Sequence, residues 1–259
     1  MSKKCVLFVL TMVLVFASSA PAVVGPDGIF PLARYEFEGS YEDTTGNGYD
    51  GAAQSGASIY NPIPLMPQWG MLELDPDNDA GVIVSGLTDL DAVTVAMWVN
   101  SDVDLDGVKS KGVALNTSGW SVGTLHFNMN YGKLKAHVNG EDPVVGTTLL
   151  PVGEWHHIAV TASDDLIAVY YDGVLEGSAV PSDNDLPTVL MSQEPTIGGW
   201  QKVLGDPTSI QREWDGLQDD VRIYNTALSA AQVRQLVPEP MTLSLLGLGG
   251  LALVRRRRK

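Results

Sequence analysis

Alternation of apolar and polar residues is the dominant pattern in the middle of the chain. Apolar residues occupy every second position from Lys133 to Val138, with Lys or His between them, which is the period of a strand that faces solvent on one side. Asn139-Gly140 follows and favours a turn. The segment 166–171 is apolar on both faces, and Asp172-Gly173 after it is a strong hairpin signal. These segments predict paired antiparallel strands.

The same texture continues in both directions, with further buried strands expected at 93–99 and 155–161. Only 229–236 has a helical pattern, because Ser229 and Gln232 form a capping box ahead of apolar Val233. Many short strands with one short C-terminal helix predict an all-β fold, a two-sheet antiparallel sandwich of the jelly-roll type.

The two ends of the chain differ from this pattern. Lys3-Lys4 precedes an apolar run from Val6 to Phe16, and small residues follow up to Ala22. This is the composition of a secretory signal peptide, here residues 1–22, with cleavage after Ala20 or Ala22. The pattern predicts a signal helix, export of the chain, and a body at 23–236.

The C-terminal segment 237–259 combines three features in a fixed order. Pro238-Glu239-Pro240 is followed by an apolar run, Met241 to Val254, and then by five cationic residues at 255–259. The run is shorter than the ~20 residues of a comfortable membrane helix, and the cationic cluster holds its end on the cytoplasmic side. The segment resembles a PEP-CTERM sorting signal, which implies recognition by a membrane-embedded exosortase in a Gram-negative bacterium that makes extracellular polysaccharide. An ordinary single-span tail anchor is the alternative, and the membrane is touched only through this segment before processing.

Charge limits the partners of the body. Residues 23–236 contain nine Lys and Arg against thirty Asp and Glu, a formal net charge of −21. So acidic a body is repelled by nucleic acid and by anionic lipid, and it favours cations. The single cysteine, Cys5, lies in the signal segment, so no disulfide is expected and a large core must stabilise the domain.

Several segments of the body resemble the laminin G-like members of the concanavalin A-like lectin/glucanase superfamily. They follow one another in the order of that family: 32–37 with the loop 43–51, 72–75, 93–99, 153–161 with 169–174, and 215–224 with 227–229. The resemblance implies a two-sheet jelly roll whose first and last strands are adjacent. It implies no particular ligand, because the fold hosts lectins, glycanases, adhesion modules and spacers.

Glycan cleavage in that superfamily uses carboxylates at alternate positions of one strand. Glu73, Asp75 and Asp77 have this spacing, but the third residue is Asp rather than Glu, and Pro76 indicates that the strand has already ended. The sequence therefore predicts a protein that is not an enzyme, with a glycan-cleaving enzyme as the least favoured alternative.

Calcium is the cofactor that the acidic loops favour. Asp102, Asp104 and Asp106 stand at alternate positions before Gly107, as in the first half of an EF-hand loop. Val113 stands where the bidentate Glu belongs and no flanking helices are predicted, so a looser loop site or a solvated acidic loop is expected.

Two further acidic arrangements are candidates for the same cation. The turn at 75–79 is the weaker one. If the opening loop meets the closing strand, Asp43 and Asn47 share an ion with Asp219, whose phase along the strand predicts an inward side chain. The alternative is that Asp219 accepts hydrogen bonds from loop amides.

Tryptophans are the candidate sugar contacts, because aromatic faces stack on the apolar faces of sugar rings. Trp98 and Trp155 lie in apolar segments and are predicted to be core residues. Four others stand beside glycine, proline, serine or charged residues: Trp69, Trp120, Trp200 and Trp214. Of these, Trp120 with Asn116 and Asn128, and Trp200 with Gln201, are the predicted ligand-binding groups, the alternative being rim residues that cover the core.

Together these patterns predict an exported, non-catalytic jelly-roll module at the cell surface or in the extracellular matrix. It binds polysaccharide or other matrix material; the alternative is a spacer of the matrix without a ligand.

Overall fold

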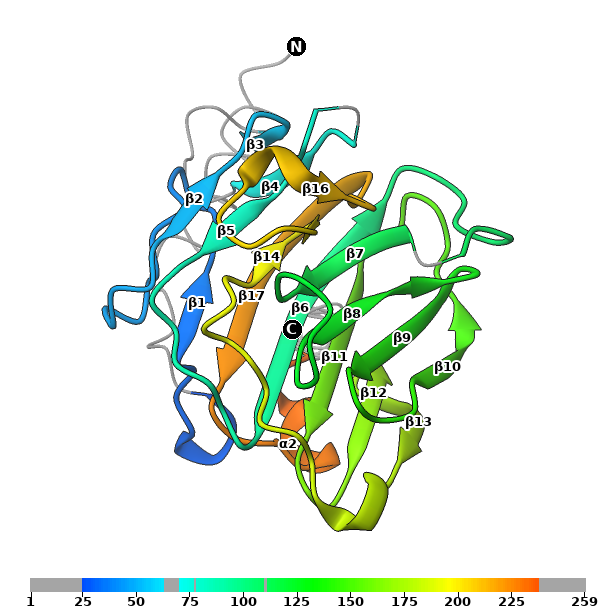
Figure 1. Ribbon diagram of the computed structural model, residues 1–259. Helices are drawn as coiled ribbons and strands as arrows, with labels where there is room; N and C mark the ends of the chain where they lie inside the picture. Colours follow the sequence, from blue (N-terminus) through cyan, green and yellow to red (C-terminus); the bar gives the residue numbers. More distant parts are fainter. Residues whose placement is uncertain (1–24, 63–69, 77, 110, 238–259) are drawn as a thin grey trace, which may run out of the picture.

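Two antiparallel sheets stack face to face in the computed structural model, which describes residues 25–62, 70–76, 78–109 and 111–237 (Figure 1). The first sheet has the order β13-β12-β11-β6-β17-β4-β3, and β1 also pairs with β17. Its strands are β1 (Ala33–Tyr35), β3 (Ala57–Tyr60), β4 (Met71–Leu74), β6 (Val93–Ser101), β11 (His156–Ala162), β12 (Ile167–Tyr171), β13 (Val174–Ala179) and β17 (Gly216–Tyr224).

The second sheet has the order β10-β9-β8-β7-β14-β5-β2. Its strands are β2 (Gly51–Ala53), β5 (Val82–Val84), β7 (Lys111–Asn116), β8 (Leu125–Asn130), β9 (Lys133–Val138), β10 (Val144–Leu149) and β14 (Thr196–Ile197). A short hairpin, β15 (Trp200–Gln201) with β16 (Ile210–Gln211), is separate from both sheets. The predicted all-β sandwich of antiparallel sheets is confirmed.

The core lies between the sheets and follows the alternation of the sequence. On β9, Leu134, Ala136 and Val138 are buried while the lysines and histidine between them are half-buried. Strand β12 is buried at every position, as expected of a strand covered on both faces. Its predicted turn is formed by Asp172 and Gly173, both at positive φ (47° and 74°), the geometry of a two-residue hairpin.

One short helix, α2 (Ala230–Gln235), covers the outer face of the first sheet. Ser229 is its N-cap and forms the predicted capping box with Gln232. Val233 and Leu236 pack there against Tyr170 and other apolar residues in a second, smaller cluster. Three single turns of 3-10 helix complete the described elements: η1 (Pro26–Gly28), η3 (Ser182–Asn184) and η4 (Pro207–Ser209).

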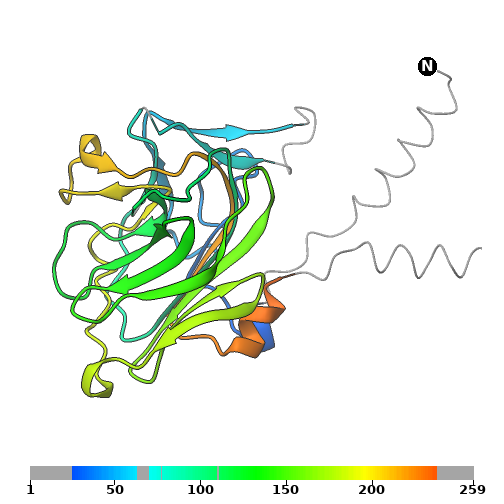
Figure 2. The same cartoon turned by 90° about the vertical axis from the view of Figure 1, so that its right-hand side faces the viewer.

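The β15–β16 hairpin projects on the other side of the molecule. In Figure 2 the hairpin and α2 lie on opposite sides of the sandwich, so each sheet has one outer face that is partly covered. The cover on the second sheet comes from the hairpin, and β15 contacts both β7 and β14. This arrangement positions the candidate site described below.

The ends of the domain meet as the resemblance implied. β1 pairs with β17 in antiparallel register, with Ala33 opposite Ile223. The predicted signal helix at 1–22 and the membrane segment at 237–259 lie outside the described residues, except for Val237. Within the described ranges, no helix is both long and apolar enough to span a bilayer.

The roles of three tryptophans differ from the sequence-based expectation. Trp98 is not a core residue: its neighbours Met97 and Val99 point inward, so Trp98 lies on the outer face of the first sheet, half-buried against His157. Trp155 precedes β11 and is also only half-buried. Trp214, expected among the surface candidates, is fully buried at 0% exposure, and its Nε1 donates a hydrogen bond to the Asn100 carbonyl oxygen at 3.0 Å.

Candidate functional site

The outer face of the second sheet carries polar residues that take no part in the hydrophobic core. Cross-strand register on β7, β8 and β9 sets them in two rows, with Asn116, His126 and His137 in one and Val113, Asn128 and Lys135 in the next. On β8 these residues alternate with Phe127 and Met129 in the core. They therefore lie on the solvent side of the sheet.

Four aromatic rings gather over the first row. The ring of His126 lies 4.4 Å from that of Trp120, 5.8 Å from that of Trp200 and 6.1 Å from that of His137, centroid to centroid. His126 is 1% exposed, whereas Trp120 is 53% exposed and forms the outer layer of the cluster. We call these four residues, Trp120, His126, His137 and Trp200, the aromatic cluster.

The β15–β16 hairpin is fastened to this face by hydrogen bonds from its first strand. Trp200 Nε1 donates to the Gly119 carbonyl oxygen at 3.2 Å, and Ser118 Oγ donates to Gln201 Oε1 at 2.6 Å. The Arg212 guanidinium lies 4.8 Å from the centre of the Trp200 ring. The hairpin thus supplies one ring and one cation to the face.

The backbone at Arg212 is held in an uncommon conformation that aims this side chain. Arg212 has a φ of 59°, in the left-handed region that non-glycine residues seldom adopt. Its carbonyl oxygen accepts a hydrogen bond from the Val113 N–H at 3.0 Å, which ties it to β7. The guanidinium remains exposed on the protein surface.

Several buried polar atoms of this face have no hydrogen-bond partner among the described residues. They are Asn116 Nδ2, His126 Nδ1, Asn128 Oδ1, His137 Nδ1 and Gln201 Nε2. Leaving a buried donor or acceptor unsatisfied costs about 1–3 kcal/mol. These are five of the ten such side-chain atoms among the described residues, and a face that holds so many of them is a candidate surface for a polar ligand.

Cationic side chains act on the histidines of this face although the body is acidic. Burial, followed by the charges of His137, Lys135 and Arg212, lowers the pKa of His126 to about 3. Burial also lowers the pKa of His137, and the neighbouring Lys135 adds to this effect. His126 is therefore neutral at neutral pH, and Lys135 and Arg212 supply the charge there.

The sequence predicted some of the residues on this face and missed others. Trp120 is exposed as predicted, and Asn128 lies directly opposite Lys135 in the second row. Trp200 is not an exposed platform: it is 7% exposed, because Arg212 and Trp120 cover it. His126 and Arg212 were missed. The alternation on β9 already placed His137 and Lys135 toward solvent, but no local pattern brings Arg212 to them.

The predicted calcium loop does not assemble in the described chain. Asp104 Oδ1 accepts a hydrogen bond from the Asp106 N–H at 2.9 Å, a local turn within the loop. Asp102 lies elsewhere, at a cavity of about 470 Å³ lined also by Glu73, Asp75 and Asp215. Among the described residues no three acidic or histidine groups form a metal-holding cluster. Calcium binding stays a prediction, and comparison of melting temperatures in calcium and in chelator tests it.

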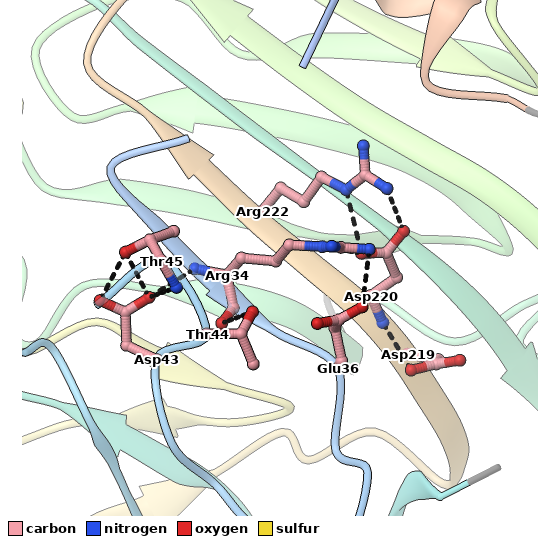
Figure 3. A network of polar contacts seen from close by, with 8 residues as sticks. All are labelled: Arg34, Glu36, Asp43, Thr44, Thr45, Asp219, Asp220 and Arg222. Carbon is pink, nitrogen blue, oxygen red and sulfur yellow. Dashed lines mark hydrogen bonds and ion pairs between the residues drawn. The ribbon is translucent and has the colours of Figure 1, made fainter. Parts of the chain in front are cut away.

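The opening loop bonds to β1 and the residue before it, and β1 in turn contacts the closing strand β17 (Figure 3). Asp43 accepts hydrogen bonds from the Arg34 and Thr45 N–H groups, both at 3.0 Å, so its oxygens organise the loop. Asn47 Nδ2 donates to the Leu32 carbonyl oxygen at 2.9 Å. The strand contributes Asp220, which pairs with Arg34 at 2.8 Å. None of these contacts brings Asp219 to Asp43 and Asn47, and an ion shared by the three residues stays a prediction.

Asp219 faces outward because a bulge changes the phase of β17. The register shifts between Asp219 and Arg222, and Asp220 has a φ of 46°. Gln218 is the buried residue instead, and its Nε2 donates to the Val113 carbonyl oxygen of the other sheet at 3.4 Å. Asp219 accepts a hydrogen bond from the neighbouring Asp220 N–H at 2.7 Å. The alternative expectation was a hydrogen bond to Asp219 from amides of the opening loop. The observed donor is instead the amide of the next residue in the strand.

Glu73 and Asp75 do not both lie on strand β4. Strand β4 ends at Leu74, before Asp75 and Pro76, as the proline predicted. Glu73 is exposed and accepts a hydrogen bond from Ser58 Oγ at 3.0 Å. Asp77 lies outside the described residues.

Two segments of the chain match models of known protein families. Residues 76–234, more than half of the sequence, match the concanavalin A-like lectin/glucanases superfamily. The chain belongs to this superfamily. Residues 236–259 match the PEP-CTERM protein-sorting motif, so the segment containing Pro238, Glu239 and Pro240 is confirmed as a sorting signal. No curated protein matches the sequence.

Solved structures of this superfamily fold are similar in shape and distant in sequence. Domain 4 of AbnA, a GH43 extracellular arabinanase from Geobacillus stearothermophilus in complex with arabinotriose, matches with a TM-score of 0.58 and 19% identity, covering 80% of this chain and 98% of that one. The ligand-binding domain of botulinum neurotoxin serotype D, in complex with N-acetylneuraminic acid, matches with a TM-score of 0.60 and 14% identity, covering 80% and 50%. The binding domain of Paraclostridial Mosquitocidal Protein 1 gives 0.57 and 13%, covering 76% and 48%. At these identities the likeness shows the fold alone.

Proposed function

We propose that this superfamily member is an exported polysaccharide-binding protein and that the aromatic cluster is its binding site. The observation that carries the proposal is the exposed ring of Trp120 beside buried, unsatisfied polar atoms of His137 and Gln201. A sugar ring presents an apolar face and a rim of hydroxyl groups. An aromatic face packs against the former, and free donors and acceptors satisfy the latter.

Two further facts support the proposal. The arabinanase domain and the toxin domain with the same fold were each solved with a sugar bound. At such low sequence identity, the positions of their sugar-binding residues cannot be carried over to this chain. The pocket that Glu73 lines with Asp75, Asp102 and Asp215 has no aromatic side chain among its described lining residues, so the aromatic cluster is the better candidate for binding a sugar.

The sorting motif supports a proposal about where the protein acts. We infer that the body crosses the inner membrane of a Gram-negative bacterium, that an exosortase processes the tail, and that the domain reaches the cell surface or extracellular matrix. The body, with a formal net charge of −21, stays soluble there and is repelled by nucleic acid. The membrane is contacted only through 241–254 before processing.

Affinity electrophoresis of the full chain in mild detergent, through gels that contain a panel of bacterial polysaccharides, tests the proposal. Trp120→Ala should migrate faster than wild type in the gel of a bound glycan. Trp98→Ala is the matched control, because it removes a half-buried tryptophan from the opposite outer face. Equal retardation of both variants and wild type would show that the glycan binds elsewhere on the protein, and no retardation of wild type in any gel would leave a ligand-free spacer as the function.

A further inference from the structure

Positive charge gathers on one face of an otherwise acidic domain. Six of the nine cationic residues of the body lie on β7 and β9, in the segment just before β7, or in the hairpin region: Lys109, Lys111, Lys133, Lys135, Lys202 and Arg212. None of the six forms an ion pair with a residue of the described ranges. By contrast, Arg34 and Arg222 on the other sheet share Asp220.

We propose that the ligand of the aromatic cluster is an anionic polysaccharide, whose sugars carry carboxylate or sulfate groups that Arg212 and Lys135 bind. This inference rests on the proposed function and names its ligand class. It follows from charge complementarity between this face and an acidic sugar, and from the positions of the two cations relative to the exposed ring.

Arg212 is placed to bind an anion next to a stacked sugar. Its guanidinium lies over Trp200, and the Trp200 ring lies 6.1 Å from the ring of Trp120. Stacking on Trp200 uses one face of the planar guanidinium and leaves its N–H groups in the plane free to form a bidentate pair with a carboxylate or sulfate. The left-handed backbone held by Val113 fixes the base of this side chain.

Lys135 flanks the same position from the sheet. It stands opposite Asn128, whose Oδ1 has no partner among the described residues, and one row away from His126. Burial lowers the pKa of Lys135, and the charges of Arg212 and Lys109 lower it further. The three cations therefore repel one another, and a bound anion would offset that repulsion.

The acidic body favours a sugar polymer over denser polyanions. Thirty carboxylates in residues 23–236 repel a nucleic acid or an anionic membrane that extends beyond this face. A polysaccharide with about one charge per sugar or fewer meets the positive face locally, and its uncharged hydroxyl groups can satisfy the neighbouring amides. Binding should weaken with salt, because exposed charges are screened over about 10 Å at 0.1 M ionic strength.

Titration of the full-length protein in mild detergent tests the inference. The carboxylate arm is polygalacturonate, the sulfate arm is κ-carrageenan with a sulfate on alternate sugars, the neutral arms are dextran and arabinan, and the polyanion control is single-stranded DNA. We expect at least tenfold tighter binding to one of the two acidic polysaccharides than to the neutral ones and to the DNA. Whichever acidic arm binds identifies the anionic group.

Charge-matched variants separate a site from general electrostatics. Arg212→Gln and Lys135→Gln should each weaken binding of the acidic polysaccharide about tenfold. Arg234→Gln removes the same charge from the exposed side of α2, on the opposite face of the sandwich, and should leave affinity within twofold of wild type. An equal loss in Arg234→Gln, or equally tight binding of DNA, would overturn the inference.

The proposed function and the inference fail in different ways. If dextran or arabinan binds as tightly as the acidic polysaccharides, with affinity lost in Trp120→Ala and kept in Arg212→Gln, the glycan site stands and its anionic preference is refuted. If none of the polysaccharides binds, both are refuted.

Discussion

His126 shows how a single side chain can mark a binding face. It is an imidazole with 1% exposure on the outer side of a strand, between two tryptophans and another histidine. One nitrogen lies 3.2 Å from Thr124 Oγ1, and the other has no partner among the described residues. A packing role alone would be filled better by an apolar residue, because burial of an unsatisfied nitrogen costs free energy.

Trp214 and Trp120 should differ strongly in how much each side chain contributes to the free energy of unfolding. Trp214→Ala should lower the free energy of unfolding by about 3–5 kcal/mol, because it leaves a cavity between the sheets and breaks the bond to the Asn100 carbonyl oxygen. Trp120→Ala should stay within about 0.5 kcal/mol of wild type, because the ring is mostly exposed. Urea denaturation followed by tryptophan fluorescence measures both. Similar destabilisation of the two variants would contradict these assignments.

The raised pKa of Asp219 predicts that the stability of the protein depends on pH. Burial, and to a lesser extent the charges of Asp220, Glu38 and Glu36, raises its pKa to about 7, above the roughly 3.9 of an unfolded aspartate. The folded state therefore holds a proton that the unfolded state has lost, and stability falls as pH rises through this window. Asp219→Asn should melt above wild type at pH 8, and the difference should vanish near pH 4. The same difference at both pH values would indicate a packing effect instead.

His126 and His157 act in the opposite direction. Burial is the main cause that lowers their pKa values to about 3 and about 4, below the roughly 6.5 of an unfolded histidine. Between pH 6.5 and 4 the unfolded chain takes up more protons, so stability falls as pH is lowered. In Asp219→Asn this loss is no longer offset, and its melting temperature should decline more steeply on acidification than that of wild type.

At the scale of elements, the β15–β16 hairpin makes the binding face out of an ordinary sheet. It covers the buried edge of the aromatic cluster with Trp200 and holds Arg212 beside β7. Its attachment uses a few bonds to the loop between β7 and β8, including the one from Ser118 Oγ to Gln201 Oε1. A small number of fastening bonds makes the hairpin sensitive to single substitutions.

Ser118→Ala should therefore loosen the hairpin. The change leaves the buried Gln201 amide without its described partner and should cost about 1–3 kcal/mol. It should also weaken glycan binding, because Arg212 and Trp200 are less well positioned. Ser121→Ala in the same loop is the control, since Ser121 is exposed and its hydroxyl forms no hydrogen bond recorded in the described structure. Hydrogen exchange at 200–212 compares the two, and equal protection would refute the fastening role.

At the scale of the whole molecule, the sorting signal begins where the folded domain ends. Helix α2 ends at Gln235, Leu236 is buried, and Val237 lies against Gly173 of the β12–β13 turn. Pro238 follows directly, so almost no linker separates the domain from the motif. Removal of the tail would leave the described body complete.

Processing of this tail predicts a change in mass. Protein recovered from the extracellular matrix should lack Met241–Lys259, as measured by intact-mass spectrometry. Replacement of Pro238-Glu239-Pro240 by alanines should leave a membrane-bound precursor, whereas alanines at 183–185, an exposed turn, should not. Full-length protein in the matrix would refute processing.

Local patterns in the sequence determined the strands, the Asp172-Gly173 hairpin, the cap at Ser229 and the C-terminal sorting signal. Alternation, turn chemistry and capping depend on neighbours within a few residues, so they can be read without the fold. The same patterns identified Trp120 and Asn128 as exposed or outward-facing candidates, because each follows from its immediate surroundings.

Tertiary structure alone decided the rest. The bulge at Asp219 and Asp220 reversed a phase that alternation predicted, because one extra residue in a strand turns its side chains to the other face. Burial of Trp200 and Trp214 depends on which distant segment covers them. Arg212 reaches the aromatic cluster only because the hairpin folds back across β7. The sequence by itself determined which segments are strands, and the packing of segments far apart along the chain decided which of their faces meets solvent and a ligand.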